Sequence, residues 1–108
     1  MKKQGGGYIF NMASYAGIKG LLGSGAYGAS KAGVIRFTET LQREVAEDNI
    51  KVTAISPAYV YTDMAKDADV AQEEMIQPED IAETMLYIMR LSKSAVVRNV
   101  VIERYGQL

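Results

Sequence analysis

The sequence has no cysteine and no histidine among its 108 residues. Without cysteine the chain has neither disulfides nor thiolate chemistry, and without histidine it has neither a Ser-His triad nor the usual zinc site. No apolar stretch approaches the roughly 18 residues of a membrane span, and the apolar run after residues 1–4 is far too short for a signal peptide. A formal net charge of −1 gives no reason to expect nucleic acid or an anionic membrane as a partner. We therefore expect a cytoplasmic protein with no metal in its site.

Hydrophobic residues make up 48% of the chain and charged residues 23%, which is ordinary for a globular domain. A chain of this length corresponds to one domain with a modest core. Short apolar runs predict strands at residues 8–12, 50–56 and 99–102, and apolar residues at helical spacing predict helices from about residue 25 to 47 and from 78 to about 91. Strands that alternate with helices form parallel sheets, so the sequence predicts an α/β fold with about three parallel strands.

In both predicted helices the spacing of apolar and polar residues defines a buried face and a solvent-exposed, or wet, face. For the long helix, the expected buried stripe consists of Val34, Phe37, Leu41 and Val45, and the expected wet face consists of Arg36, Glu39, Gln42 and Arg43. For the second helix, which starts at Pro78, the expected buried stripe consists of Ile81, Met85, Ile88 and Met89. Small residues crowd the first turns of the long helix, which indicates the close approach of another backbone. Asn49, after that helix, is expected to adopt the left-handed backbone conformation that often ends a helix.

The stretch from residue 14 to residue 31 contains a hydroxyl at Ser14, a phenol at Tyr27 and an ammonium at Lys31, three groups that could act together in a proton transfer. Tyr27 and Lys31 are four residues apart, so on a helix they share one face, one turn apart. A free phenol, with a pKa of about 10, is a poor acid or base near neutrality, but an adjacent ammonium favours the phenolate. Such a phenol could give a proton to a carbonyl oxygen or take one from an alcohol. Ser14 would hydrogen-bond the same oxygen and hold it in place.

The chain resembles the second half of a short-chain dehydrogenase/reductase in three segments that follow in the same order, G-Y-I-F-N-M-A-S-Y-A-G, Y-G-A-S-K-A-G and I-K-V-T-A-I-S-P-A-Y-V-Y-T-D-M. The resemblance covers essentially the whole chain and implies a partial Rossmann-like, doubly wound fold. It also implies an NAD(P)-dependent oxidoreductase that interconverts a carbonyl and an alcohol by hydride transfer. In this family the serine falls on Ser14 and the tyrosine acid/base on Tyr27. The lysine falls on Lys31, which lowers the tyrosine pKa and binds the nicotinamide ribose.

The resemblance further implies the residues that hold the cofactor, NAD or NADP. They are Tyr27, Lys31, Pro57, the backbone of Val60, and Thr62. The family has Pro-Gly where this chain has Ala58 after the proline, and the alanine is strained only if that position needs a positive φ. Residues 63–76 correspond to a substrate lid. The glycine-rich loop at residues 17–25 is either a flexible connector or a segment that shapes the substrate site.

Family members open with a strand, a glycine-rich phosphate loop and a helix that together hold the cofactor pyrophosphate. No glycine pattern of this kind occurs in the sequence. We therefore expect residues 1–108 to be the carboxyl-terminal portion of a Rossmann-fold domain, and to be inactive by themselves. The alternative is a non-catalytic remnant or oligomerisation module that binds no dinucleotide. The resemblance places the long helix in a subunit interface, so we expect a homo-oligomer, with a small carbonyl or alcohol as its substrate.

Overall fold

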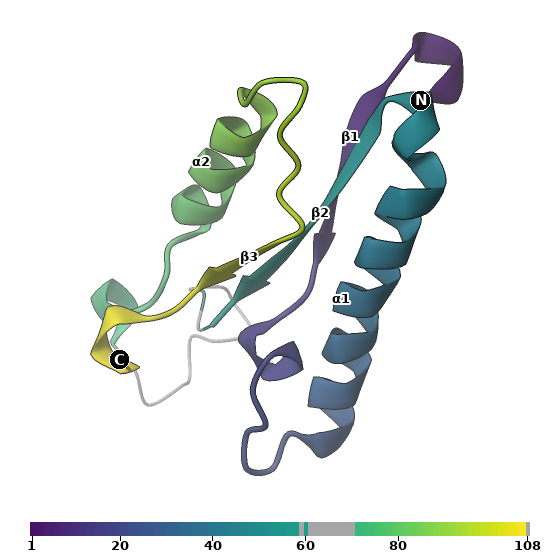
Figure 1. Cartoon of the computed structure of the whole chain (residues 1–108). Helices are drawn as coiled ribbons and strands as arrows, with labels where there is room; N and C mark the ends of the chain where they lie inside the picture. Colours follow the sequence, from purple (N-terminus) through teal and green to yellow (C-terminus); the bar gives the residue numbers. More distant parts are fainter. Residues whose placement is uncertain (59, 61–70, 108) are drawn as a thin grey trace.

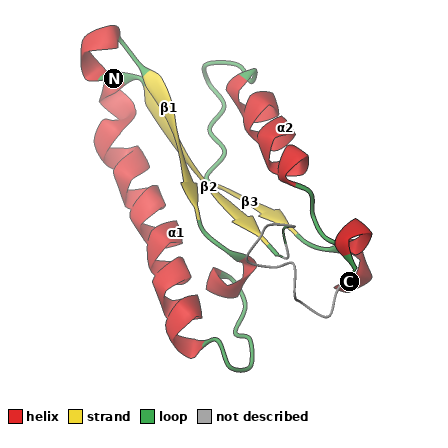
Figure 2. Cartoon of the chain, turned by 180° about the vertical axis from the view of Figure 1, so that it is seen from behind, coloured by secondary structure: helices red, strands yellow, loops and turns green. Residues whose placement is uncertain are grey.

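The computed structural model describes residues 1–58, 60 and 71–107, and it shows three parallel strands between two long helices. The strands are β1 (Gly7–Met12), β2 (Ile50–Pro57) and β3 (Asn99–Ile102), in the order β1-β2-β3. The helices are α1 (Gly25–Val45) and α2 (Pro78–Met89), and Figures 1 and 2 show them on opposite sides of the sheet. Short 3-10 helices lie at Lys2–Gln4, Tyr15–Gly17, Ala46–Asp48, Gln72–Glu74 and Tyr105–Gln107. The predicted α/β, partial Rossmann-like arrangement is confirmed.

The central strand β2 forms the middle of the core. It pairs with β1 from Ile50 onward and with β3 from Ala54 onward, so it has a strand on each side. Helices lie over both faces of the sheet, and the side chains of Val52, Ala54 and Ile55 are fully buried. A strand covered in this way has no wet face, which explains why its sequence is nearly continuous in small and apolar residues instead of alternating.

The parallel register brings the carboxyl ends of β1 and β2 to one edge of the sheet. Met12 lies opposite Ile55, and the next residue, Ala13, donates its N–H to the Ile55 carbonyl at 2.8 Å. Chain segments that leave these two strands therefore start side by side, which is where α/β proteins gather their ligands. In the sheet that the structure describes, β1 has a neighbouring strand on one side only.

The face of α1 that packs on β1 is partly polar. Thr38 is only 1% exposed, and its hydroxyl donates to the Val34 carbonyl at 2.7 Å and accepts from the Asn11 amide at 3.0 Å. These hydrogen bonds satisfy the buried Thr38 hydroxyl, so a threonine can occupy a position where hydrophobicity alone favours an apolar residue. The predicted burial of Phe37 is wrong, because Phe37 is 61% exposed on the neighbouring position of the helix.

Gln42 of α1 completes the first half of β2. Because β3 pairs with β2 only from Ala54, the backbone of Ile50 and Val52 has no strand partner on that side. The Gln42 side chain donates to the Ile50 carbonyl at 3.0 Å and accepts from the Val52 N–H at 2.6 Å. The prediction that Gln42 belongs to the wet face is therefore wrong, since its amide takes the place of a missing strand.

Helix α2 begins as predicted, at Pro78. The N–H of Gln77 donates to the carboxylate of Asp80 at 2.8 Å, which closes a capping box at the start of the helix. Ile88 is buried, but Met89 is 53% exposed, which corrects its predicted burial. One step along a helix turns about 100°, so Met89 cannot share the sheet-facing side with Ile88.

Two backbone predictions concern single residues. Asn49 has φ of 58°, which confirms the expected left-handed residue after the long helix, and its amide donates to the Gly5 carbonyl at 3.1 Å. Among the described residues, Asn49 is the one non-glycine residue with a positive φ. Ala58 therefore carries no strain of the kind that a positive φ would cause.

Only part of the predicted lid can be compared with the structure. Residues 63–70 lie outside the described residues. Met75 and Ile76 are buried, and Ile76 forms a parallel bridge with Val60. These two residues therefore belong to the interior of the fold and not to a lid.

Candidate active site

Ser14 lies immediately beyond the carboxyl end of β1. It caps the short 3-10 helix Tyr15–Gly17, and its side-chain oxygen accepts a hydrogen bond from the Ala16 N–H at 3.2 Å. This bond uses a lone pair of the oxygen and leaves the O–H free to donate to another group. The sequence prediction that Ser14 sits just past the carboxyl end of this strand agrees with its position.

Tyr27 and Lys31 come from the first turns of α1, as the helical spacing predicts. The Lys31 Nζ lies 5.7 Å from the centroid of the Tyr27 ring, within the range of a cation–π contact. The same Nζ donates to the Met12 carbonyl at 3.4 Å, so it bridges the helix and the end of β1. Tyr27 is 53% exposed, which leaves its hydroxyl accessible to a small molecule.

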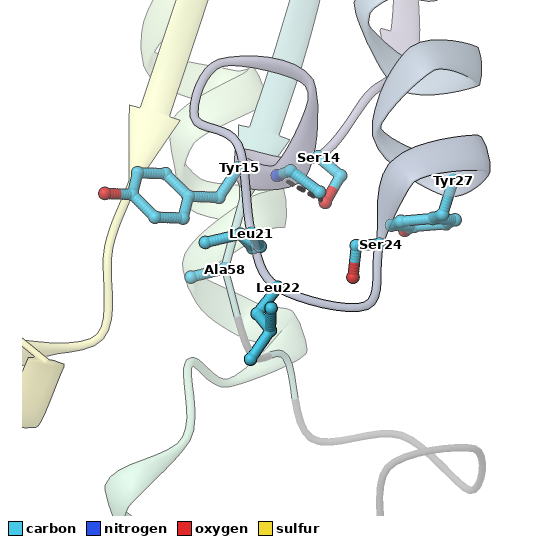
Figure 3. A pocket seen from close by; sticks show the side chains of 8 residues that line it. Ser14, Tyr15, Leu21, Leu22, Ser24, Tyr27 and Ala58 are labelled. Carbon is cyan, nitrogen blue, oxygen red and sulfur yellow. Dashed lines mark hydrogen bonds between the residues drawn. The ribbon is translucent and has the colours of Figure 1, made fainter.

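An open pocket of about 410 Å³ joins Ser14 to Tyr27. Its lining residues are Ser14, Tyr15, Ala16, Leu21, Leu22, Ser24, Tyr27 and Ala58. Figure 3 shows Ser14 and Tyr27 on neighbouring segments, with Ser24 between them on the chain that leads into α1. Four of the lining residues carry a hydroxyl group and the others form an apolar wall, which suits a small molecule that carries one polar reacting group.

Ser24 is a pocket residue that the sequence reasoning missed. Its place just before α1 is typical of an N-cap, but its side chain makes no capping hydrogen bond. The glycine-rich loop at residues 17–25 contributes Leu21, Leu22 and Ser24 to the pocket wall. Of the two interpretations of that loop, the structure favours the one in which it shapes the site.

The residues expected to hold a cofactor are only partly brought together. Pro57 ends β2, and the next residue, Ala58, lines the same pocket as Ser14. Val60 follows in its bridge with Ile76. Thr62 lies outside the described residues. In the part of the chain that the structure describes, the segment that begins at Pro57 leaves the sheet next to the loop that carries Ser14.

Glycine allows the Ser14 loop and α1 to pack closely. A Cβ at Gly28 would lie 2.9 Å from the Ala16 carbonyl oxygen, which confirms the close backbone approach expected from the small residues of this helix. A Cβ at Gly17 would lie 2.7 Å from the Lys31 carbonyl carbon. Gly33, by contrast, faces open space.

The described residues also bear on metals and membranes. They contain no cluster of three or more acidic side chains that could hold a metal ion. None of their helices combines the length and the apolarity that a membrane span needs.

A fold with parallel strands, and with a serine, a tyrosine and a lysine at the carboxyl edge of the sheet, is the arrangement found in short-chain dehydrogenases. The family model described as short chain dehydrogenase matches residues 1–73. This chain belongs to the short-chain dehydrogenase family. It is similar to carbonyl reductase family member 4 of Xenopus laevis, with 38% identity over 96 residues that cover 82% of this chain and 41% of the relative.

Solved structures agree with this assignment. A β-ketoacyl-ACP reductase from Bacteroides thetaiotaomicron matches with a TM-score of 0.82 and 38% identity, over 99% of this chain and 44% of the reductase. The closed form of a serine dehydrogenase complexed with NADP⁺ matches with a TM-score of 0.72 and 27% identity, over 95% of this chain and 45% of that one. The chain thus spans less than half the length of these relatives.

Proposed function

We propose that this chain carries the proton-transfer residues of an oxidoreductase that interconverts a small carbonyl compound and its alcohol. The observation that carries the proposal is that Ser14 and Tyr27 line one pocket while the Lys31 ammonium stands 5.7 Å from the Tyr27 ring. Membership of the short-chain dehydrogenase family supports the same chemistry. The relatives named above include a carbonyl reductase and a serine dehydrogenase, which favours a small polar substrate.

In this proposal Tyr27 is the acid and base of the reaction. In the direction of reduction it gives its proton to the carbonyl oxygen, and in the direction of oxidation it takes that proton back from the alcohol. The Ser14 O–H, which its bond from Ala16 leaves available, donates to the same oxygen and orients it. The positive charge of Lys31 stabilises the negative charge that Tyr27 develops when it releases the proton.

The residues fit the nicotinamide end of a dinucleotide. Lys31 offers an ammonium beside the ring of Tyr27, and Pro57 leads into Ala58 on the pocket wall. Lys31, Tyr27, Pro57 and Val60 would hold the nicotinamide and its ribose, with Thr62 outside the described residues. When bound, NADH or NADPH would supply the hydride in reduction, and NAD⁺ or NADP⁺ would accept it in oxidation. The sequence contains no glycine-rich loop for the pyrophosphate, so the proposal assigns only the nicotinamide end to this chain.

The site is tested in a chimera that joins the glycine-rich amino-terminal portion of the Bacteroides reductase to residues 1–108. The unmodified chimera should oxidise NADH or NADPH in the presence of a small β-keto ester. Tyr27→Phe should lower kcat by about 10²–10⁴-fold, since it removes only the proton carrier. Tyr105→Phe, at an exposed tyrosine outside the pocket, is the matched control. Near-normal turnover by the Tyr27→Phe chimera would refute the assigned role.

For residues 1–108 alone we propose no measurable turnover. The nicotinamide end contributes too few contacts to hold a dinucleotide whose adenine and pyrophosphate have no partner in this sequence. Calorimetric titration with NADH and with NADPH tests this, and micromolar binding by the isolated chain would contradict it. A chain that is inactive both alone and in the chimera would instead support the alternative, a module without catalysis.

A further inference from the structure

Two glycines bring together the segments that carry the candidate site. Gly17 stands three residues after Ser14, and a Cβ there would lie 2.7 Å from the Lys31 carbonyl carbon and 2.8 Å from the Ala32 nitrogen. Gly28 stands next to Tyr27, and a Cβ there would lie 2.9 Å from the Ala16 carbonyl oxygen. Each glycine therefore faces the backbone of the other's segment. We refer to these two approaches together as the reciprocal glycine contact.

Gly17 and Gly28 are required for steric reasons, because they lack a Cβ, and not because their backbone has a positive φ. The glycines with positive φ in the described residues are Gly5, Gly6 and Gly23, so Gly17 and Gly28 have conformations open to any residue. The distances of 2.7–2.9 Å are far inside the 3.5–4.0 Å of ordinary carbon contact. Because the opposing atoms belong to the backbone, they cannot rotate away as a side chain can. An added methyl group must push the Ser14 loop and α1 apart.

The contact between Lys31 and the sheet depends on this separation. The Lys31 Nζ reaches the Met12 carbonyl at 3.4 Å, which is already at the long end of hydrogen-bond distances. Moving the Lys31 backbone away from the loop would break that bond and release the ammonium from its position beside Tyr27. The same movement would separate Ser14 from Tyr27 across the pocket.

We propose that Gly17 and Gly28 are positioning residues of the site. The reciprocal glycine contact sets the distance between the loop that carries Ser14 and the helix that carries Tyr27 and Lys31. It thereby holds the ammonium of Lys31 beside the ring of Tyr27. This inference rests on the proposed function, and it adds that the site geometry is fixed by backbone packing outside the reacting groups.

The test measures the reactivity of Tyr27 in residues 1–108. Tetranitromethane nitrates phenolates, and mass spectrometry of peptides gives the rate at each tyrosine, with the exposed Tyr105 as internal reference. Lys31→Met should lower the Tyr27 rate several-fold relative to Tyr105. Gly17→Ala and Gly28→Ala should lower it to the level of Lys31→Met without changing the rate at Tyr105.

Matched controls come from glycines that face open space. Gly20→Ala lies in the same loop as Gly17, and Gly33→Ala lies in the same helix as Gly28. Both should leave the Tyr27 rate at the wild-type value. Gly17→Ala and Gly28→Ala variants that fold, by circular dichroism, and keep that rate would overturn the proposal. If Gly17→Ala does not fold, Gly28→Ala, which meets a single backbone oxygen at short range, decides the question.

A second readout separates this inference from the proposed function. The ε-methylene NMR signal of Lys31 and its cross-relaxation with Met12 report the position of the ammonium whatever its effect on Tyr27. If Lys31→Met leaves nitration of Tyr27 unchanged, the proposed role of Lys31 fails. The reciprocal glycine contact is then judged on the Lys31 signal, which must move in Gly17→Ala and Gly28→Ala and stay in place in Gly20→Ala and Gly33→Ala.

Discussion

Lys31 holds its ammonium 5.7 Å from the centre of the Tyr27 ring, one helical turn away. Helical spacing alone would leave a lysine free to turn into solvent, but here the Nζ also donates to the Met12 carbonyl at the end of β1. The position of the charge therefore depends on tertiary packing as well as on the four-residue interval. A motif of tyrosine and lysine on an isolated helix would lack this second contact.

Replacing Lys31 and replacing Tyr27 should change the steady-state kinetic constants in different ways. In the chimera described above, Lys31→Met should lower kcat and also raise the KM for NADH or NADPH, because the lysine has a role in proton transfer and a role in cofactor binding. Tyr27→Phe should lower kcat far more than it raises that KM, because it removes the proton carrier but only one hydroxyl among the groups that would hold the nicotinamide end. Steady-state kinetics with the dinucleotide as varied substrate separates the two patterns. Equal KM values in both variants would remove the second role from Lys31.

Gln42→Ala should destabilise the fold even though Gln42 lies on α1 among charged neighbours. The change leaves the Ile50 carbonyl and the Val52 N–H without partners beside a buried strand, at a cost of about 1–3 kcal/mol. Urea unfolding followed by circular dichroism measures the difference. Glu44→Ala, at an exposed position of the same helix, is the control and should change stability by less than about 0.5 kcal/mol. Equal effects of the two changes would remove the strand-completing role from Gln42.

Thr38→Val tests the polar contact between α1 and β1. Valine keeps the shape of threonine but leaves the Asn11 amide without its acceptor, so the free energy of unfolding should fall by about 1–3 kcal/mol. Thr38→Ser retains the hydroxyl and should recover most of the loss that comes from hydrogen bonding. The measurement is again urea unfolding. A valine variant as stable as the wild type would show that the Asn11 amide finds another partner.

We also expect the isolated chain to form a homodimer. In the described sheet β1 has a free side, and Phe37 exposes 61% of its surface on α1. An unpaired strand edge and an exposed aromatic side chain favour association over a free monomer. Sedimentation equilibrium at micromolar concentration should therefore give twice the monomer mass, and Phe37→Asp should weaken the dimer if α1 is in the interface. A folded monomer at that concentration would contradict the expectation.

The strands, the helices and their order could be predicted from the sequence because short apolar runs mark the strands, helical spacing marks the helices, and two boundaries carry a residue with a clear conformational role. Pro78 starts α2 and Asn49 turns the chain after α1, and both lie where the sequence analysis placed them. The buried face of α1 could not be predicted in the same way. Hydrophobicity favours Phe37 over Thr38, but the hydrogen bond from Asn11 reverses that order, and it joins residues 27 positions apart.

In the candidate site, too, some residues could be predicted from the sequence and others could not. The hydroxyl, phenol and ammonium could be chosen from the sequence because their chemistry depends on residue type and spacing. Ser24 could not, since its place before α1 is equally typical of a helix cap. The segment that packs against Gly28 could not be predicted either. Small residues indicate the close approach of some backbone, but only the fold shows that it is the backbone of Ala16.

The register of β1 has a consequence for how the chain folds during synthesis. Gly7 pairs with Ile50, so β1 leaves the ribosome more than forty residues before the strand that binds it. Throughout that interval an uncharged segment, G-Y-I-F-N-M, stays without its partner, and the connection between the two strands contains the whole of α1. Long-range parallel pairing of this kind slows folding and exposes apolar strands to association with other nascent chains. The residues most at risk before folding are thus those that lead directly to Ser14.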